Sequence, residues 1–315
     1  GGGRPPPPAT LAWYELMLSL YAVLIDGAIY ASWLFLVAAG LTVIYGVMRI
    51  LNMAHGSFYA IGAYAAASLV GWYFNNGVGP VWVGYLMMLG CALAAGLVVG
   101  LLIERGLLRF MYGRDEVLMV IITYALLLIL EDAMKMIWGV NPYFAYQPYA
   151  EMGRSVLAGL KVSNYDLMLV AVSLVLGLSL WLWLERTHQG KVLRAVIHDR
   201  EVAQAMGVNV RRVFTLVFVL GTVLGTLAGA LTAPAISVAP GIGVEIIVLA
   251  FAVVVIGGMG SIEGAALGAL LVGLSRAAAV HYAPQFELFV IYGVMALVLA
   301  VRPQGLFGRV LARKI

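Results

Sequence analysis

Apolar stretches separated by short polar interruptions follow one another along almost the whole chain. A helix needs about 20 predominantly apolar residues to cross a bilayer, and a β-barrel would instead show alternating segments of about ten residues. The pattern predicts an all-α polytopic membrane bundle with eight to ten spans, in which the first segment is either a span or an amphipathic N-terminal helix. The expected segments are 12–27, 28–48, 54–72, 81–103, 117–138, 165–184, 213–234, 244–258, 264–280 and 286–302.

The amino-acid composition supports a membrane protein and argues against a soluble domain. Of the 315 residues, 63% are hydrophobic and 11% are charged, whereas a soluble domain is about half apolar and a quarter charged. Cys91 is the single cysteine, so an internal disulfide is excluded. The proline run in GGGRPPPP cannot form a helix. Residues 1–15 are therefore expected to be a flexible N-terminal tail, and 16–315 a single transmembrane domain.

Basic residues concentrate in three segments that the span count puts on one side of the membrane. The segments 103–116, 185–212 and 302–315 hold 13 of the 19 lysines and arginines. Because cytoplasmic loops are enriched in Lys and Arg, these segments and the C-terminus are predicted to be cytoplasmic. The loop 139–164, rich in Tyr and Pro, then lies outside. Two interpretations of it are open: an interfacial aromatic belt, or a docking surface for an external partner.

A polar cluster interrupts the apolar pattern at RILNMAHG, residues 49–56. Asn52 and His55 are three residues apart and share a face if the segment is helical. Such groups at membrane depth face the bundle interior or a water-filled path. Three roles are open for Asn52 and His55: bracing the backbone freed by a helix break, contacting a passing substrate, or forming a gate. The hydroxyls of Ser57 and Tyr59 are further candidates for lining the same path.

Metal binding and catalysis are not expected. His55 has no second His, Cys or carboxylate at ligand spacing, and the chain shows no nucleophile with an adjacent base. The basic balance is attributed to membrane orientation, so no nucleic-acid partner is predicted.

Glycines dominate a second unusual stretch, GGMGSIEGAALGALLVG. Small residues at four-residue spacing let helix backbones approach closely. A packing role is therefore expected for Gly56, Gly257, Gly258, Gly260, Gly264 and Gly268. The two stretches share one design, in which an apolar helix is followed by a short break and then a helix with small residues. Paired interrupted helices in two halves of a transporter point to a central pathway.

The segment 185–212 is too polar to span the membrane. Within it, Gln189 to Met206 is predicted to be one short helix, with Gly207 as the residue that ends it. Such a helix lies on the bilayer surface or docks in a groove of a partner. Its apolar stripe is expected to comprise Val192, Ala195, Val196, Ala203 and Met206.

Four blocks resemble the LivH-type permeases of the ABC importers for branched-chain amino acids. They are GLTVIYGVMRILNMAHGSFYAIGAYAA, RAVIHDREVAQAMGVNVRRV with the span after it, VIGGMGSIEGAALGALLVGL, and RPQGLFGR. They occur in the order of that family and cover nearly all of the chain after residue 15. The sequence departs from the family at Glu263, where proline is common, and two roles are open for this carboxylate: pairing with an arginine or tuning a gate.

The resemblance implies an all-α permease with interrupted helices and a cytoplasmic coupling helix that seats in an ATP-binding subunit. Arg194, Asp199, Arg200 and Gly207 are the implied coupling positions. The implied partners are a LivM-like second permease, two ATP-binding subunits, an external substrate-binding protein and membrane lipid. The implied location is the bacterial inner membrane. No cofactor is expected on this chain, which lacks a phosphate-binding loop, so ATP-Mg is expected on the partner subunits.

Other functions remain to be distinguished. Related permeases carry urea, amides or other amino acids. An ion-coupled secondary transporter would need carboxylates inside the membrane, and Asp26, Glu131, Asp132 and Glu245 are expected near span ends instead. An integral-membrane enzyme would need a catalytic cluster.

Overall fold

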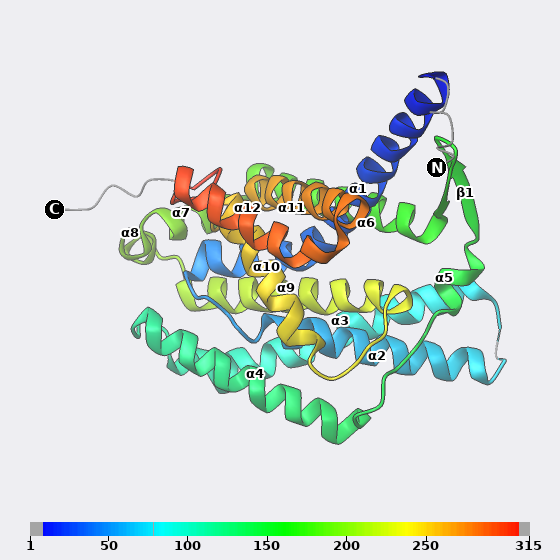
Figure 1. The fold of residues 1–315 in the computed structure, drawn as a ribbon. Coiled ribbons are helices and arrows are strands. Elements are labelled where there is room, and N and C mark those ends of the chain that lie inside the picture. The colour runs from blue at the N-terminus through cyan, green and yellow to red at the C-terminus, as the bar shows by residue number, and fades with distance from the viewer. Residues whose placement is uncertain (1–8, 78, 309–315) are drawn as a thin grey trace.

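Helices make up nearly the whole fold in the computed structural model, which describes residues 9–77 and 79–308 (Figure 1). The long helices are α1 (Ala9–Met48), α2 (His55–Asn75), α3 (Val81–Gly106), α4 (Glu116–Trp138), α6 (Asn164–Arg186), α9 (Val210–Thr232), α10 (Ile242–Gly257), α11 (Ile262–Tyr282) and α12 (Glu287–Val301). The short elements are η1 (Leu108–Phe110), α5 (Gln147–Glu151), β1 (Arg154–Leu157), β2 (Leu160–Ser163), α7 (His188–His198), α8 (Arg200–Ala205), η2 (Ala233–Ala235) and η3 (Pro284–Phe286). Strands β1 and β2 form one antiparallel hairpin.

The predicted all-α membrane bundle is confirmed. Seven helical segments within the described residues are long and apolar enough to cross a membrane, and they contain α1, α3, α4, α6, α9, α11 and α12. Helix α10, with 16 residues, is shorter, and α2 has 21 residues but many small and polar ones. Both match predicted segments, and with them the described residues contain nine helices of at least 15 residues.

The prediction of two separate segments at 12–27 and 28–48 was wrong, because α1 runs unbroken through both. Gly27, at the expected boundary, lies inside the helix and against α11, where a Cβ would meet the backbone of Leu274 at 3.0 Å. A glycine inside a helix costs about 1 kcal/mol relative to alanine, and this close packing offsets that cost. Helix α1 also begins at Ala9, inside the range predicted for the tail, while residues 1–8 lie outside the described residues.

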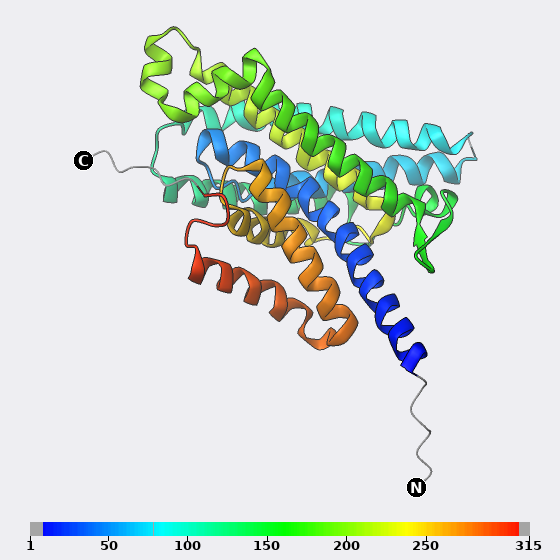
Figure 2. The ribbon, with the colours of Figure 1, turned by 90° about the horizontal axis from the view of Figure 1, so that it is seen from above.

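Helices α1, α2 and α9 form the centre of the bundle. Helix α1 packs against α11 and α9, and α9 in turn packs against α2 and α3. Small residues permit this closeness: a Cβ on Gly62 of α2 would overlap the backbone of Thr226 in α9. Helix α12 lies at the periphery, and the N-terminal end of α1 projects beyond the other helices (Figure 2).

The two ends of the bundle differ in their elements. Helices α7 and α8, the connection between α3 and α4, and the end of α12 lie at one end, as predicted for the three basic segments (Figure 1). Arg309, Arg313 and Lys314 of the third segment lie outside the described residues. Helix α5 and the β-hairpin lie at the opposite end. Arg276, also predicted for that end, pairs with Glu287 and lies 3.9 Å from the centroid of the Tyr30 ring.

Candidate functional site

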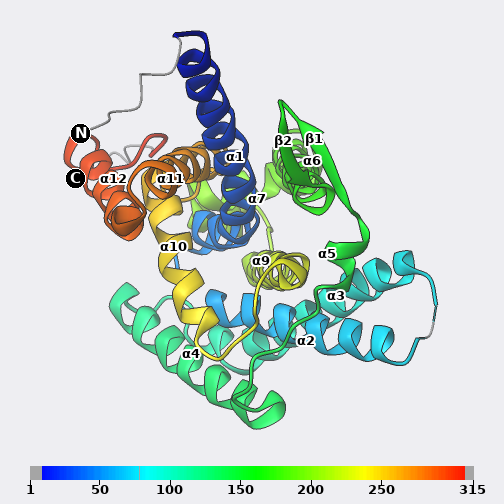
Figure 3. The ribbon, with the colours of Figure 1, turned by 45° about the vertical axis from the view of Figure 1, so that its right-hand side comes forward.

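Two helix breaks meet inside the bundle. Helix α1 ends at Met48, and Arg49 turns the chain with a left-handed backbone (φ 53°) before α2 begins at His55. On the other side of the contact, the chain after η2 leads back into the bundle and α10 begins at Ile242. A Cβ on Gly56 would overlap the carbonyl of Gly243. The N-terminal ends of α2 and α10 are therefore in direct backbone contact, beside α4 (Figure 3).

Helix α4 bonds to both breaks through residues spaced four apart, two of them by side chains and one by its backbone carbonyl. Thr123 Oγ1 accepts a hydrogen bond from the Met53 N–H at 3.2 Å and donates to the Leu51 carbonyl at 3.2 Å. One turn on, the Leu127 carbonyl accepts from Ser57 Oγ at 3.4 Å. After another turn, the Glu131 carboxylate accepts from the Gly241 N–H at the start of α10. Positions four apart share a helix face, so this single face of α4 bridges the two breaks.

Glu131, expected near a span end, lies seven residues before Trp138, where α4 ends, and is only 7% exposed. Its Oε2 atom has no hydrogen-bond partner among the described residues. The sequence signal was the adjacent pair of Glu131 and Asp132 in an apolar helix, since such groups are retained for a function more often than for stability. Thr123 carried no comparable signal.

The residues predicted to line a path are buried within the chain. His55 Nε2 lies 3.1 Å from the Val37 carbonyl of α1, and Tyr59 Oη lies 2.6 Å from Thr232 Oγ1 of α9. With Ser57 bonded to α4, three of the four side chains connect α2 to neighbouring helices. Asn52 differs, because it is fully buried and neither side-chain polar atom has a partner among the described residues.

The glycines singled out for packing lie against backbone. Gly257 and Gly264 face each other where α10 meets α11, and Gly268 faces the carbonyl of Val253. Gly260 lies against Gly46 of α1. Gly258 has a left-handed backbone (φ 99°) and lies against Gly308. A Cβ at any of these positions would overlap backbone atoms of the neighbouring segment.

Glu263 has a simple local role in the structure. The Ser261 side chain caps α11 by accepting from the Gly264 N–H at 3.0 Å, and its hydroxyl lies 3.1 Å from Glu263 Oε2. A carboxylate in the first turn of a helix is stabilised by the helix dipole. Glu263 is exposed, and among the described residues it forms no ion pair with an arginine.

The segment between α6 and α9 is two helices, so the prediction of one helix from Gln189 to Met206 was wrong. The break falls at Asp199, whose carboxylate caps α8 by accepting from the N–H groups of Glu201 and Val202 at 3.0 and 3.1 Å. Asp, Ser, Thr and Asn are favoured at such N-caps. Gly207 does follow the last turn, with φ 88°.

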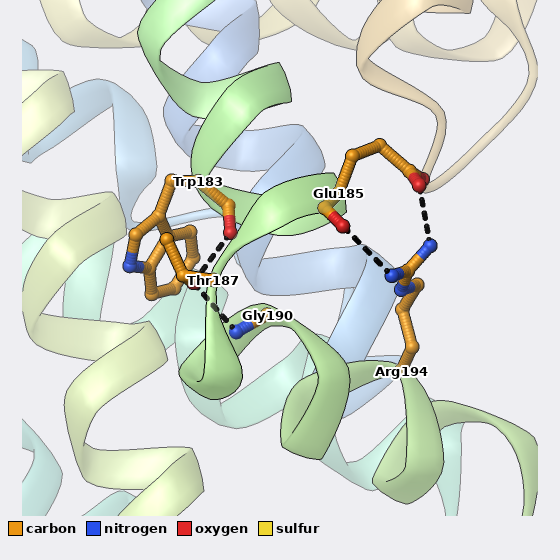
Figure 4. A network of polar contacts seen from close by, with 5 residues as sticks. All are labelled: Trp183, Glu185, Thr187, Gly190 and Arg194. Atoms are coloured by element: carbon orange, nitrogen blue, oxygen red, sulfur yellow. Dashed lines mark hydrogen bonds and ion pairs between the residues drawn. The ribbon is translucent and has the colours of Figure 1, made fainter.

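The corner between α6 and α7 is held by a local network (Figure 4). The Thr187 hydroxyl donates to the Trp183 carbonyl at 2.6 Å and accepts from the Gly190 N–H at 3.0 Å. Arg194 donates to the Glu185 carboxylate at 2.6 Å and to the Glu185 carbonyl at 3.2 Å. Arg194, predicted to contact a partner, therefore braces α7 against α6.

The apolar stripe predicted for this segment is only partly buried. Leu193, Val196 and Ala203 are buried against the bundle. Within the predicted stripe, Ala195 is exposed, and Met206, beyond the break at Asp199, is 81% exposed. Val202 is also 55% exposed. The tip of α8 thus presents apolar side chains away from the bundle.

A chain of rings connects α8 to the connection between α3 and α4. The Arg200 guanidinium lies 5.0 Å from the centroid of the Phe214 ring, and Tyr112 meets that ring edge-on at 5.1 Å. The Tyr112 hydroxyl donates to Glu104 at 2.8 Å. Burial, aided by this hydrogen bond, raises the pKa of Tyr112 and keeps the hydroxyl a neutral donor. Arg200 of α8 is therefore connected through these contacts to Phe214 of α9 and Glu104 of α3.

Comparisons with known proteins agree with this architecture. The permease protein BraD of the high-affinity branched-chain amino acid transport system of Pseudomonas aeruginosa is 31% identical over 93% of this chain and 97% of its own length. LivH of Escherichia coli is 26% identical over 96% of this chain and 99% of its own. A probable LivH of Methanocaldococcus jannaschii is 28% identical over 91% of this chain and 92% of its own.

Among solved structures, PsaBC from Streptococcus pneumoniae in complex with Fab aligns over 93% of this chain and 97% of that chain. The TM-score is 0.49 at 12% identity, which is too low to support an argument. Residues 23–299 match the family described as the permease component of the branched-chain amino acid transport system. This match covers most of the chain, which therefore belongs to that family of multi-pass membrane permeases.

Proposed function

We propose that this chain is a permease subunit of an ATP-driven ABC importer that carries leucine, isoleucine and valine across the bacterial inner membrane. The observation that supports this most directly is the meeting of α2 and α10 at their N-terminal ends inside the bundle. Helix N-termini carry partial positive charge, and half-helices with this arrangement bind the anionic groups of substrates in transporters. The names of BraD and LivH supply the substrate class.

The energy would come from partner subunits. A LivM-like second permease would complete the translocation path, and an external substrate-binding protein would deliver the amino acid. Two ATP-binding subunits would hold ATP-Mg and hydrolyse it, so this chain would act as a transport subunit and not as an enzyme. Their closure would move α7 and α8, whose exposed apolar tip at Val202 and Met206 suits a cleft on such a subunit.

Orientation follows from the same assignment. The end that carries α7, α8 and the end of α12 would face the cytoplasm, together with the C-terminus (Figure 1). Helix α5 and the β-hairpin would face the external binding protein. Transport would proceed by alternating access, in which the path opens to one side of the membrane at a time. Movement at α8 would pass through Arg200 and Phe214 to α9, which packs directly against α2.

Uptake into proteoliposomes tests the proposal. The complete complex should import radiolabelled leucine only with ATP and the binding protein present. Excess unlabelled isoleucine or valine should compete, while urea and acetamide should not. Competition by urea and not by isoleucine would assign the chain to the urea and amide permeases. Uptake driven by an ion gradient without an ATP-binding subunit would indicate a secondary transporter.

A further inference from the structure

Glu131 is a buried carboxylate whose main partner is a helix end. It lies on α4, and its Oε1 accepts a hydrogen bond from the N–H of Gly241, 110 residues further along the chain. Among the described residues it forms no ion pair, and its Oε2 has no hydrogen-bond partner although the residue is only 7% exposed. A carboxylate at membrane depth is costly without a partner, so the helix end is what stabilises it.

The N-terminus of α10 is held by the Glu131 carboxylate of α4. Gly241 has a left-handed backbone (φ 92°), and no side chain of the N-cap position bonds to the first turn. A Ser, Thr, Asp or Asn at that position would accept hydrogen bonds from the N–H groups of the first turn. Glu131 instead accepts, from a different helix, a bond from the N–H of Gly241 itself, just before the first turn. A carboxylate that arrives on a separate helix can leave again when that helix moves.

We propose that Glu131 occupies the place of a substrate carboxylate and that the two groups exchange during transport. The α-carboxylate of the amino acid takes the N–H groups at the start of α10. The released Glu131 carboxylate binds the α-ammonium group. This assignment rests on the proposed function and adds to it a substrate-binding site formed by Glu131 and the N-terminus of α10.

The exchange conserves charge pairing. An α-amino acid is a zwitterion, so its arrival leaves the net charge of the site unchanged. Each carboxylate keeps a positive partner throughout, either the helix end or the ammonium group. Burying an unpaired charge costs several kcal/mol even after relaxation, and this exchange avoids that cost.

The surroundings suit an apolar side chain and a moving α4. Leu128, three residues before Glu131, is 47% exposed, and Val244, three residues after Gly241, is 41% exposed. Both lie about one helical turn from the groups that form the proposed site. Of the hydrogen bonds described for α4, those of Thr123 and Leu127 go to residues 51–57, and that of Glu131 goes to the start of α10. Separating Glu131 from α10 therefore leaves the bonds of Thr123 and Leu127 in place.

The test uses the complete complex in proteoliposomes with Glu131→Gln. The amide oxygen still accepts from Gly241, so assembly and ATP hydrolysis stimulated by the loaded binding protein should stay within about twofold, whereas leucine uptake should fall roughly tenfold or more, as for loss of a hydrogen bond to a charged group. Glu131→Asp, which keeps the charge, should restore part of the uptake. Asp132→Asn is the matched control, because Asp132 is exposed and pairs with Lys135, and it should transport normally.

A leucine analogue that carries a diazirine locates the site directly. Cross-links at Leu128 or Val244 in the wild-type complex, lost in Glu131→Gln, would support the assignment. Wild-type uptake by Glu131→Gln, or cross-links confined to other helices, would overturn it while leaving the proposed function intact. A wild-type complex that imports no amino acid would overturn both. If Glu131→Gln fails to assemble, Glu131→Asp with the same cross-linking decides.

Discussion

Gly229 of α9 lies directly against the backbone carbonyl of Tyr59 in α2. A side chain at Gly229 would overlap that oxygen, so the two helices can be this close only because the position is glycine. The contact lies one helical turn before Thr232, which bonds the Tyr59 hydroxyl. Helix α2 is thus fixed to α9 by backbone contact and by a side-chain hydrogen bond at the same place.

Gly229→Ala is expected to lower the free energy of unfolding by about 1–3 kcal/mol, the usual cost of overpacking. Thermal unfolding of the purified complex in detergent measures it. Gly71→Ala in α2 is the control, because nothing lies within 4 Å of its added Cβ, and it should stabilise the helix by roughly 0.5–1 kcal/mol. Equal effects of the two substitutions would show that α2 and α9 are not in backbone contact.

His55→Leu removes the hydrogen bond between α2 and the Val37 carbonyl. We expect thermal stability to fall by about 1–3 kcal/mol, because a buried polar contact is lost. Asn52→Leu is the matched substitution, and it should leave stability unchanged or raise it, because the Asn52 amide has no partner among the described residues. If His55→Leu abolishes uptake without loss of stability, His55 lines the path and does not brace α2.

Gly207→Val is expected to uncouple the transporter. Nothing lies within 4 Å of an added Cβ, so the cost is the left-handed backbone (φ 88°), which a β-branched residue adopts only with strain. The turn after α8 should shift, and ATP hydrolysis stimulated by the loaded binding protein should fall. Gly207→Asn should retain coupling, since asparagine tolerates this conformation. Asp199→Lys, which also removes the cap of α8, should resemble Gly207→Val, and normal stimulated hydrolysis in both would remove the docking assignment.

Exchanging the charges of Arg194 and Glu185 distinguishes two roles for Arg194: bracing α7 against α6, and contacting the ATP-binding subunit. The ion pair with Glu185 is exposed, with 42% of each side chain accessible, so Arg194→Ala should change the free energy of unfolding by less than about 1 kcal/mol. Arg194→Glu should reduce stimulated ATP hydrolysis. Adding Glu185→Arg should restore it if Arg194 only braces α7 against α6. Failure of the double variant to recover would show that Arg194 touches the ATP-binding subunit.

Cysteines introduced at Arg200 and at Ala150, in a Cys91→Ala background, are expected to be labelled from opposite sides of the membrane. Arg200 lies in α8 and Ala150 in α5, at opposite ends of the bundle (Figure 1). A membrane-impermeant maleimide applied to spheroplasts should reach Ala150 from outside and Arg200 only after lysis. Labelling of both before lysis would contradict the orientation.

The sequence by itself determined that the long apolar segments are helices and that the chain breaks at RILNMAHG and in the glycine-rich stretch. Apolar runs of membrane length leave helix as the favoured conformation, because the bilayer core offers no water to satisfy backbone groups. Polar residues and clustered glycines interrupt these runs, because the first are costly at membrane depth and the second weaken a helix. The boundary expected between residues 27 and 28 was wrong, because α1 runs unbroken from Ala9 to Met48.

Tertiary structure alone decided what the breaks do. Gly56 and Gly243 are brought into contact, and Glu131 reaches Gly241, across sequence separations that no local pattern encodes. The break at Asp199 is local by contrast, because the carboxylate accepts from N–H groups only two and three residues further along the chain. Side-chain hydrogen bonds depend on direction and on distances of about 3 Å. Only the packed bundle sets those distances, so the partners of Glu131, His55 and Arg194 became visible only in the folded chain.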